Sequence, residues 1–236
     1  MLSIKNLSKT YKAGKKAVDS VSLEISAGDT YGFIGHNGAG KTTTIKCITG
    51  ILDFDNGEIT IDGRSIKTDP INCKSVMAYV PDNPDLYENM TGIQYLNFIS
   101  DIFAISAAER EARIKQFADM FDFMQNLGDL ISSYSHGMKQ KLALISALIH
   151  SPKLLILDEP FVGLDPKASH LLKEYMQEFC KNGGAIFFST HVLEVAEKIC
   201  NKIAIIQNGK IVINGETGKV LGDKSLENLF LELIEE

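Results

Sequence analysis

Eight consecutive residues carry the groups that bind nucleotide phosphates. They read Gly35-His36-Asn37-Gly38-Ala39-Gly40-Lys41-Thr42 and fit the pattern Gly, four residues, Gly, Lys, then Ser or Thr. The glycines let the backbone turn tightly around an anion, so that its N–H groups and the start of the following helix face the phosphates. Lys41 adds a positive charge, and the Thr42 hydroxyl is placed to bind the Mg²⁺ that bridges the outer phosphates. The stretch therefore predicts a nucleotide site.

Two adjacent carboxylates follow an apolar run later in the chain. Asp158 and Glu159 come directly after residues 154–157, whose four consecutive apolar side chains are typical of a strand covered on both faces of a parallel sheet. Ligands bind at the carboxyl ends of such strands. With a phosphate loop upstream, Asp158 is the natural second anchor for Mg²⁺, and Glu159 could accept a proton from an attacking water. The structural alternative is a capping pair of carboxylates at a strand-to-helix turn.

Two other side chains suit a nucleotide but have a second interpretation. Tyr11 offers a flat aromatic face to a base, although a half-buried tyrosine of an edge strand fits its context as well. His191 follows an apolar strand and could hydrogen-bond a terminal phosphate, whereas a histidine at a strand end is more often structural.

Hydrophobic periodicity predicts the elements that position these groups. Alternating segments at 2–7 and 21–25 look like antiparallel strands of a small sheet, and 57–63 is a further short strand. Apolar strands separated by helices indicate a mainly parallel sheet with right-handed crossovers. We expect these strands at 30–34, 76–80, 154–157 and 185–189, with helices at 41–49 and 167–180.

The remaining segments have equally clear patterns. Asn208-Gly209 lies between 203–206 and 211–213 and predicts a hairpin with a primed turn. Residues 225–234 predict a short amphipathic packing helix.

From Thr91 to about His150 the pattern is mostly helical. One amphipathic helix is expected at 107–124, and the last one begins after Ser133-Tyr134-Ser135 and stops before Pro152. We therefore expect a single domain over residues 1–236, with a helical subdomain inserted at about 88–150.

Composition limits the classes of function. The 236 residues, 44% hydrophobic and 23% charged, are typical of a globular protein, and a net charge of −6 gives no overall attraction to nucleic acid or anionic lipid. No apolar run approaches the roughly 20 residues that cross a bilayer, and the start is not a signal peptide, so a cytoplasmic location is expected. The four cysteines lack the paired spacing of a zinc or redox site.

Five motifs, taken together, resemble those of the ATP-binding subunit of an ABC transporter. They occur in that family's order and are 35–43, Tyr134 to Lys141, Leu154 to Pro160, Gly163-Leu164-Asp165 and Ser189-Thr190-His191. The resemblance covers essentially the whole chain. The fold it implies is α/β: a P-loop NTPase core with a mainly parallel sheet, an N-terminal antiparallel β subdomain and an inserted α-helical subdomain.

The resemblance implies a role for each matching residue. Tyr11 stacks on adenine, while Lys41 and the loop amides hold the phosphates of ATP. Thr42 and Asp158 hold Mg²⁺, Glu159 is the general base, and His191 contacts the γ-phosphate. The implied nucleotide-binding residues are Tyr11, Gly35, His36, Asn37, Gly38, Ala39, Gly40, Lys41, Thr42, Thr43, Asp82, Ser135 and Gly137.

Ser135 and Gly137 match the signature motif, which in this family binds the γ-phosphate of ATP held by the other protomer. Both open a helix whose free N–H groups attract an anion. Asp165 resembles the aspartate that crosses the dimer interface.

Two positions depart from the family pattern. His136 stands where most members have glycine, which is tolerated if the backbone there needs no glycine-only angle. Asp82 stands where a glutamine usually senses the metal and the attacking water; being shorter, it would reach Mg²⁺ only through a water. Both departures resemble variants common in exporter-type subunits with a separately encoded membrane protein.

The resemblance implies hydrolysis of ATP to power transport, with export favoured, by one of two nucleotide-binding subunits. The partners are a transmembrane permease and a second subunit, either an identical chain or a close paralogue, and no nucleic acid is expected. The chain would lie at the inner face of the cell membrane, with the helical subdomain and residues 82–90 forming the groove for a permease helix. The alternatives are an ABC-type ATPase in DNA repair or ribosome function, and a regulator that binds nucleotide without hydrolysis.

Overall fold

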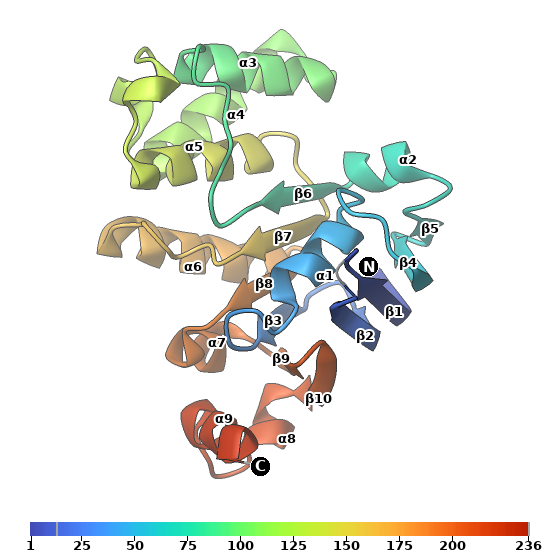
Figure 1. Cartoon of the computed structure of the whole chain (residues 1–236). Coiled ribbons are helices and arrows are strands. Elements are labelled where there is room, and N and C mark those ends of the chain that lie inside the picture. Colours follow the sequence, from blue (N-terminus) through green and yellow to red (C-terminus); the bar gives the residue numbers. More distant parts are fainter. Residues whose placement is uncertain (13, 236) are drawn as a thin grey trace.

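The computed structural model describes residues 1–12 and 14–235, arranged around two sheets (Figure 1). Residue 236, the end of the predicted domain range, and residue 13 lie outside the described residues. No described helix has the length and apolar character to cross a membrane.

The smaller sheet is antiparallel, as the alternating segments predict. Its strands run in the order β2-β1-β4-β5, with bounds Lys16–Ile25, Leu2–Thr10, Asn56–Ile61 and Arg64–Ser65. Ile4 pairs with Leu23 on one side and Ile59 on the other, and all three side chains are buried. One face of the sheet is thus apolar and packs on the core.

The central sheet has the order β10-β9-β3-β8-β7-β6. Only β10 is antiparallel to its neighbour. The strands, in chain order from β3, are Thr30–Ile34 (β3), Met77–Val80 (β6), Leu154–Asp158 (β7), Ala185–Thr190 (β8), Lys202–Gln207 (β9) and Lys210–Glu216 (β10). Every residue of β3, β7 and β8 is buried, which confirms the parallel sheet expected from their unbroken apolar runs.

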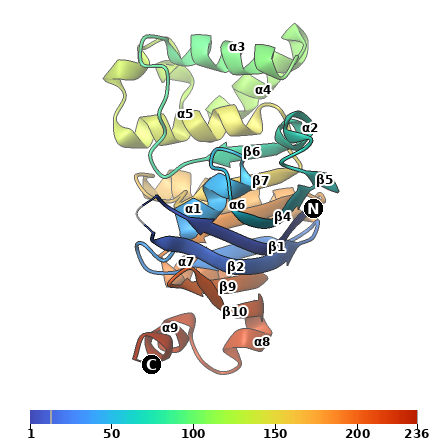
Figure 2. The same cartoon turned by 45° about the vertical axis from the view of Figure 1, so that its right-hand side comes forward.

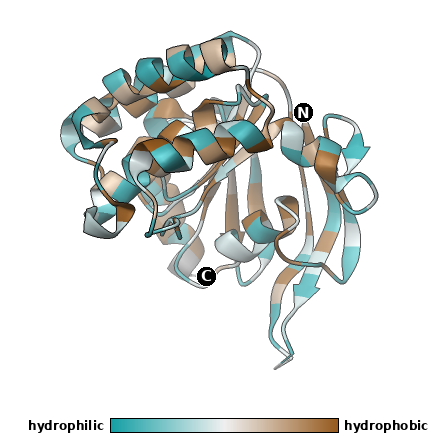
Figure 3. Ribbon diagram, turned by 90° about the horizontal axis from the view of Figure 1, so that it is seen from above, coloured by the Kyte–Doolittle hydropathy of each residue, from teal (hydrophilic) through white to brown (hydrophobic). Residues whose placement is uncertain are grey.

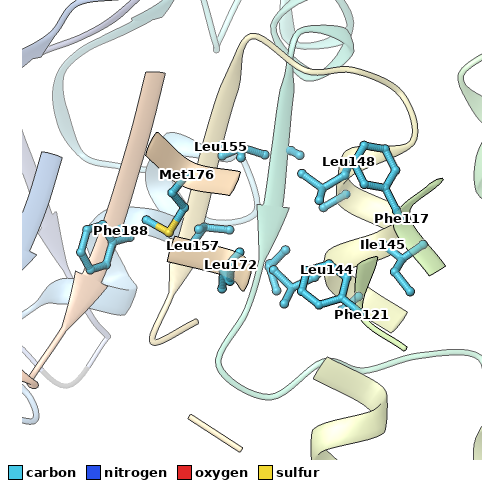
Figure 4. Packing of buried hydrophobic residues seen from close by; sticks show 14 of the residues in the cluster. Phe117, Phe121, Leu144, Ile145, Leu148, Leu155, Leu157, Leu172, Met176 and Phe188 are labelled. Atoms are coloured by element: carbon cyan, nitrogen blue, oxygen red, sulfur yellow. The ribbon is translucent and has the colours of Figure 1, made fainter. Parts of the chain in front are cut away.

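Two hydrophobic clusters cover the two faces of this sheet. Leu155 and Leu157 of β7 belong to one cluster, and Leu154 and Ile156 belong to the other, because successive side chains of a strand point to opposite faces. The first cluster joins the sheet to α6 (Pro166–Lys181) and to the helical region, as Figure 4 shows for Leu172 and Phe188. The second joins it to the small sheet and to α1 (Lys41–Ile48), which Figure 2 shows beside the central strands.

Local signals start and stop the helices as predicted, with one exception. The helices of the inserted region are α3 (Gly92–Ile102), α4 (Ala107–Met120) and α5 (His136–Leu148). Thr91 forms a capping box with Gln94, and Gly50 follows α1 with φ 66°. The helices carry hydrophilic and hydrophobic residues together, as expected for amphipathic helices (Figure 3).

The predicted end of α4 is four residues too late. The helix stops at Met120 because Asp122 takes a left-handed backbone with φ 54°, where glycine is the usual residue. The Phe123 N–H donates to Ala118 O at 2.8 Å and the Asp122 N–H to Asp119 O at 3.1 Å, which is a Schellman ending. This turn buries both Phe121 and Phe123.

The hairpin prediction is confirmed by backbone angles. Asn208 and Gly209 have φ of 49° and 80°, so both central residues have the positive φ of a type I′ turn. The closing helix α9 runs over Leu226–Glu235. Three short helices escaped prediction, α2 (Pro70–Ser75), α7 (Leu193–Ile199) and α8 (Thr217–Leu221).

Asp29 joins the turn before β3 to the start of β9. Asp29 is buried, and its carboxylate accepts hydrogen bonds from the Ser26 N–H at 2.7 Å, Lys202 Nζ at 2.8 Å and Asn201 Nδ2 at 3.0 Å. Burial opposes ionisation of Asp29, but these three bonds outweigh it and hold the pKa of the carboxyl below its usual value.

We predict that Asp29→Asn lowers the free energy of unfolding near neutral pH by about 1–3 kcal/mol, since buried donors lose a charged acceptor. The contribution of Asp29 is present above its unfolded pKa of about 3.9 and is lost as pH falls through the lower folded pKa. Urea unfolding of both proteins from about pH 7 to about pH 3 should show the difference shrinking toward acid.

The matched control is Asp62→Asn. Asp62 accepts a hydrogen bond from Lys153 Nζ at 2.9 Å, but its side chain is 37% exposed, so we expect a change below about 1 kcal/mol. A deficit of Asp29→Asn that stays constant down to about pH 3 would contradict the assignment of its effect to charge.

Candidate functional site

The strand order brings together groups that lie far apart in the sequence. In β3, β8 and β7, which are neighbours, Ile34 pairs with Thr190 and Ser189 pairs with Asp158, so the three strands end side by side. The phosphate loop follows β3, Glu159 follows β7, and His191 follows β8. The carboxyl edge of the sheet therefore collects the predicted groups from three strands.

Glycines of the phosphate loop are required by neighbouring backbone. Gly40 has φ 115°, and a Cβ there would lie 2.5 Å from Ala17 O of β2. A Cβ on Gly35 would lie 2.5 Å from Ile206 O of β9. Lys41 is buried and folds back over the loop, with Nζ donating to Gly35 O at 2.7 Å and His36 O at 3.4 Å. The loop thus encloses the lysine ammonium with its own carbonyl groups.

Asp158 is the centre of a hydrogen-bonded triad. Thr42 Oγ1 donates to Asp158 Oδ2 at 2.8 Å, and Ser189 Oγ donates to Asp158 Oδ1. Burial raises the pKa of this carboxyl, against the opposing effect of the two hydroxyl bonds. A hydroxyl and a carboxylate oxygen in direct contact are the hard oxygen ligands that Mg²⁺ prefers, so these residues fit the ion.

Glu159 lies between the lysine and the histidine. Its Oε1 is 3.6 Å from Lys41 Nζ and 3.0 Å from His191 Nδ1, and its Oε2 accepts from the His191 N–H at 3.3 Å. Oε1 is enclosed but accepts no aligned hydrogen bond within the described part of the chain. The backbone of Glu159 has φ 49° and its N–H donates to Ser189 Oγ at 3.2 Å. The carboxylate is positioned with one oxygen available to a further donor.

Lys41, Thr42, Asp158 and Glu159 line a pocket of about 250 Å³, whereas Ser189 and His191 are not among its described lining residues. It is lined by Tyr11, Lys15, Ala17, His36, Asn37, Gly38, Gly40, Lys41, Thr42, Thr43, Asp82, Asp158 and Glu159. Tyr11 is 43% exposed, and its hydroxyl lies 3.2 Å from Thr43 Oγ1. Gly35 and Ala39 are predicted residues that shape the loop without lining the pocket. The pocket lining therefore combines the exposed aromatic side chain of Tyr11 with the carboxylates of Asp82, Asp158 and Glu159.

Sequence reasoning missed three residues of this site. Lys15 and Ala17 line the pocket from the turn and strand that follow Tyr11, and their proximity to Tyr11 was the available signal. Ser189, named in the sequence only as part of a motif, is buried at the end of an apolar strand, where a polar side chain needs a partner. That signal does not identify the partner, which the structure shows to be Asp158.

The signature residues lie elsewhere in the chain. Ser135 caps α5, with Oγ accepting from the Met138 N–H at 3.3 Å, and neither Ser135 nor Gly137 is among the described residues that line the pocket. His136 lies in the first turn of α5 and has no positive φ, so the expected condition for replacing glycine is met. Asp82 lines the pocket and accepts from the Asn83 N–H at 2.9 Å.

Comparison with known proteins agrees with this architecture. A family model described as "ABC transporter" matches residues 18–162. The chain is 34% identical over 241 residues to the "ABC-type transporter ATP-binding protein EcsA" of Bacillus subtilis (strain 168), covering 100% of this chain and 97% of that protein.

Solved structures are similar over nearly the whole chain. A "Structure of ATP binding subunit of ABC transporter" has a TM-score of 0.94 and 35% identity, with 99% of each chain covered. A "Dimeric structure of a post-hydrolysis state of the ATP-binding cassette MJ0796 bound to ADP and Pi" has a TM-score of 0.84 over 92% of this chain and 99% of that one. Its 23% identity supports the fold alone. The predicted fold class is confirmed.

We predict that Gly137→Ala destabilises the start of α5, because a Cβ at residue 137 would collide with Gly163 O. Thermal or urea unfolding should show a loss of about 1–3 kcal/mol, the usual effect of overpacking. The control is Gly128→Ala, where a Cβ meets nothing within 4 Å, and its stability should match the wild type. Equal stability of the two variants would contradict the close approach of residues 137 and 163.

Proposed function

The chain belongs to the ABC transporter family as an ATP-binding subunit that hydrolyses ATP to power transport through a membrane partner, and we propose that the pocket above is half of its ATPase site. The single observation that carries the proposal is the triad of Thr42, Asp158 and Ser189 beside Glu159, at the meeting of three strand ends.

Nucleotide binding follows from the lining of the pocket. Tyr11 stacks on adenine with its exposed face, and the loop N–H groups receive the phosphates at the start of α1. Lys41 Nζ exchanges its bonds to Gly35 O and His36 O for phosphate oxygens. Thr42 and Asp158 would hold Mg²⁺, which would supply positive charge to the phosphates of the nucleotide. His36, Asn37, Gly38 and Thr43 complete the cradle.

Hydrolysis needs a base for the attacking water. Oε1 of Glu159 is enclosed, has no aligned donor and lies 3.0 Å from His191 Nδ1. Glu159 can therefore accept a proton from the water while His191 contacts the γ-phosphate. Asp82 lines the same pocket from the segment after β6 and, being short, would reach Mg²⁺ only through a water. The reaction converts ATP and water to ADP and phosphate.

A second protomer supplies the rest of the site. Ser135 and Gly137 lie at the start of α5, where free N–H groups attract the γ-phosphate of ATP bound to the other subunit. The similar cassette MJ0796 is described as dimeric, which supports this arrangement. The second subunit is an identical chain or a close paralogue.

Exposed apolar side chains support contact with a permease. Tyr87, in the segment 82–90, is 59% exposed and packs edge-on against Phe98 of α3, with ring centroids 5.6 Å apart. Ile102 at the end of α3 is 60% exposed. We propose that a cytoplasmic helix of the permease covers this surface. The subunit would then lie at the inner face of the cell membrane, in a transporter of exporter type.

We predict that Glu159→Gln binds ATP but loses hydrolysis by about 100-fold or more, the typical contribution of a general base. Phosphate release and ATP affinity are measured together, with Glu58→Gln on the exposed part of β4 as the control. If wild type and Glu159→Gln turn over equally slowly while both bind ATP, the chain is a regulator without hydrolysis.

We predict that Ser135→Arg leaves ATP binding by the monomer nearly intact yet abolishes hydrolysis, since Ser135 serves the other protomer. When two copies of this chain form the dimer, mixing Ser135→Arg with Glu159→Gln should restore activity, because one of the two sites then has both an intact Glu159 and an intact Ser135. Loss of ATP binding by the Ser135→Arg monomer would show instead that Ser135 supports its own phosphate loop.

A further inference from the structure

The loop that follows Glu159 lies directly against the first turn of α5. This loop, residues 159–165, joins β7 to α6. The Gly163 carbonyl occupies the space that a Cβ on Gly137 would need, and a Cβ on Gly163 would lie 2.5 Å from the His136 ring. Gly163 has φ 80°, so glycine is required there both for its backbone and for this close approach. The start of α5 and the loop are therefore in van der Waals contact.

An ion pair fixes the end of the same loop to the same helix. Lys141 Nζ lies 2.7 Å from Asp165 Oδ2, with the lysine side chain 18% exposed. Asp165 Oδ1 accepts from the Ala168 N–H at 2.8 Å and so caps α6. The Lys141 ammonium, followed by the cap, holds the pKa of Asp165 below its usual value. Each oxygen of this carboxylate thus has a separate partner.

Gln140 adds an independent observation on this face of α5. Its side chain is fully buried, and neither amide atom has a hydrogen-bond partner among the residues that the structure describes. Residues 136, 137, 140 and 141 lie on one side of a helix, so Gln140 follows His136 and Gly137 one turn later. A buried amide without partners among the described residues opposes stability.

The other end of the loop determines the geometry of Glu159. Its φ of 49° is uncommon for a residue with a side chain and persists only where the surroundings impose it. The Val162 N–H donates to Glu159 O at 3.1 Å, so the loop closes on the carboxylate residue. Releasing Asp165 would let this turn relax and move Glu159 relative to Lys41, whose Nζ lies 3.6 Å from Glu159 Oε1, whereas Tyr11 lies outside the loop.

We propose that Lys141 is a positioning residue that makes the two half-sites of one chain move together. By holding Asp165, it keeps the loop against α5, so that Glu159 in its own pocket and Ser135 at the start of α5 form one unit. The inference rests on the two-protomer site proposed above. It gives Asp165 a partner within its own chain, in addition to the dimer contact that the family resemblance implies.

The test is a double-mutant cycle on ATP hydrolysis. Lys141→Met removes one partner, and Asp165→Asn removes the charge of the other while an asparagine still caps α6. Each variant should lower kcat by about tenfold, as expected for loss of one charge-assisted contact, with the KM for ATP within about twofold of wild type. The double variant should be no worse than either single one, because both remove the same interaction. Lys141→Arg should restore most of kcat.

The control is Lys153→Met, which breaks the exposed pair with Asp62 at 2.9 Å and should leave kcat unchanged. The role of Lys141 would be overturned if Lys141→Met had the kcat of wild type. It would also be overturned if the loss of kcat in the double variant equalled the product of the losses in the two single variants. In parallel, sedimentation measures whether ATP makes the Glu159→Gln variant associate with itself. If the variant associates, a failed double-mutant cycle removes only the role of Lys141. If it does not associate, a site built from two copies of this chain is removed, and this inference with it.

Discussion

A buried carboxylate holds the site together. Asp158 ends β7, an interior strand next to the edge strand β6. Its two oxygens accept hydrogen bonds from hydroxyl groups of α1 and β8, so one side chain connects three elements. Burial raises the pKa of the carboxyl and makes its charge unfavourable in the protein alone. The divalent cation that we propose for Thr42 and Asp158 would offset that charge and so reduce the cost of burying the carboxylate.

The packing of the sheet makes this arrangement possible. Because β7 is apolar on both faces, it is covered on each side by a hydrophobic cluster, and its only polar side chain emerges at the carboxyl end. The backbones of β2 and β9 approach the phosphate loop so closely that Gly40 and Gly35 admit no Cβ. Rigid neighbours thus set the shape of the loop, and the function of the loop depends on the packing of the whole core.

One of the two departures from the family pattern has a local explanation. His136 is accommodated because its backbone is helical, and its ring packs against Gly163, whose positive φ favours glycine.

The α4 boundary shows the limit of periodicity. The amphipathic pattern continues to Met124, but burial of Phe121 and Phe123 around a left-handed Asp122 ends the helix earlier. Periodicity reports which faces are apolar, whereas a helix ends where backbone bonds and packing favour a turn.

The sequence by itself determined most strands and helices and the chemistry of each motif, because phosphate-loop glycines, apolar runs and capping residues act over a few neighbouring positions. The tertiary structure decided which motifs meet. Insertion of β8 between β3 and β7 brings Ser189 to Asp158 and His191 to Glu159, and the contact of Gly163 with Gly137 joins the loop to α5. Those pairings link residues more than 20 positions apart, where strand order and packing, and no local propensity, choose the partner.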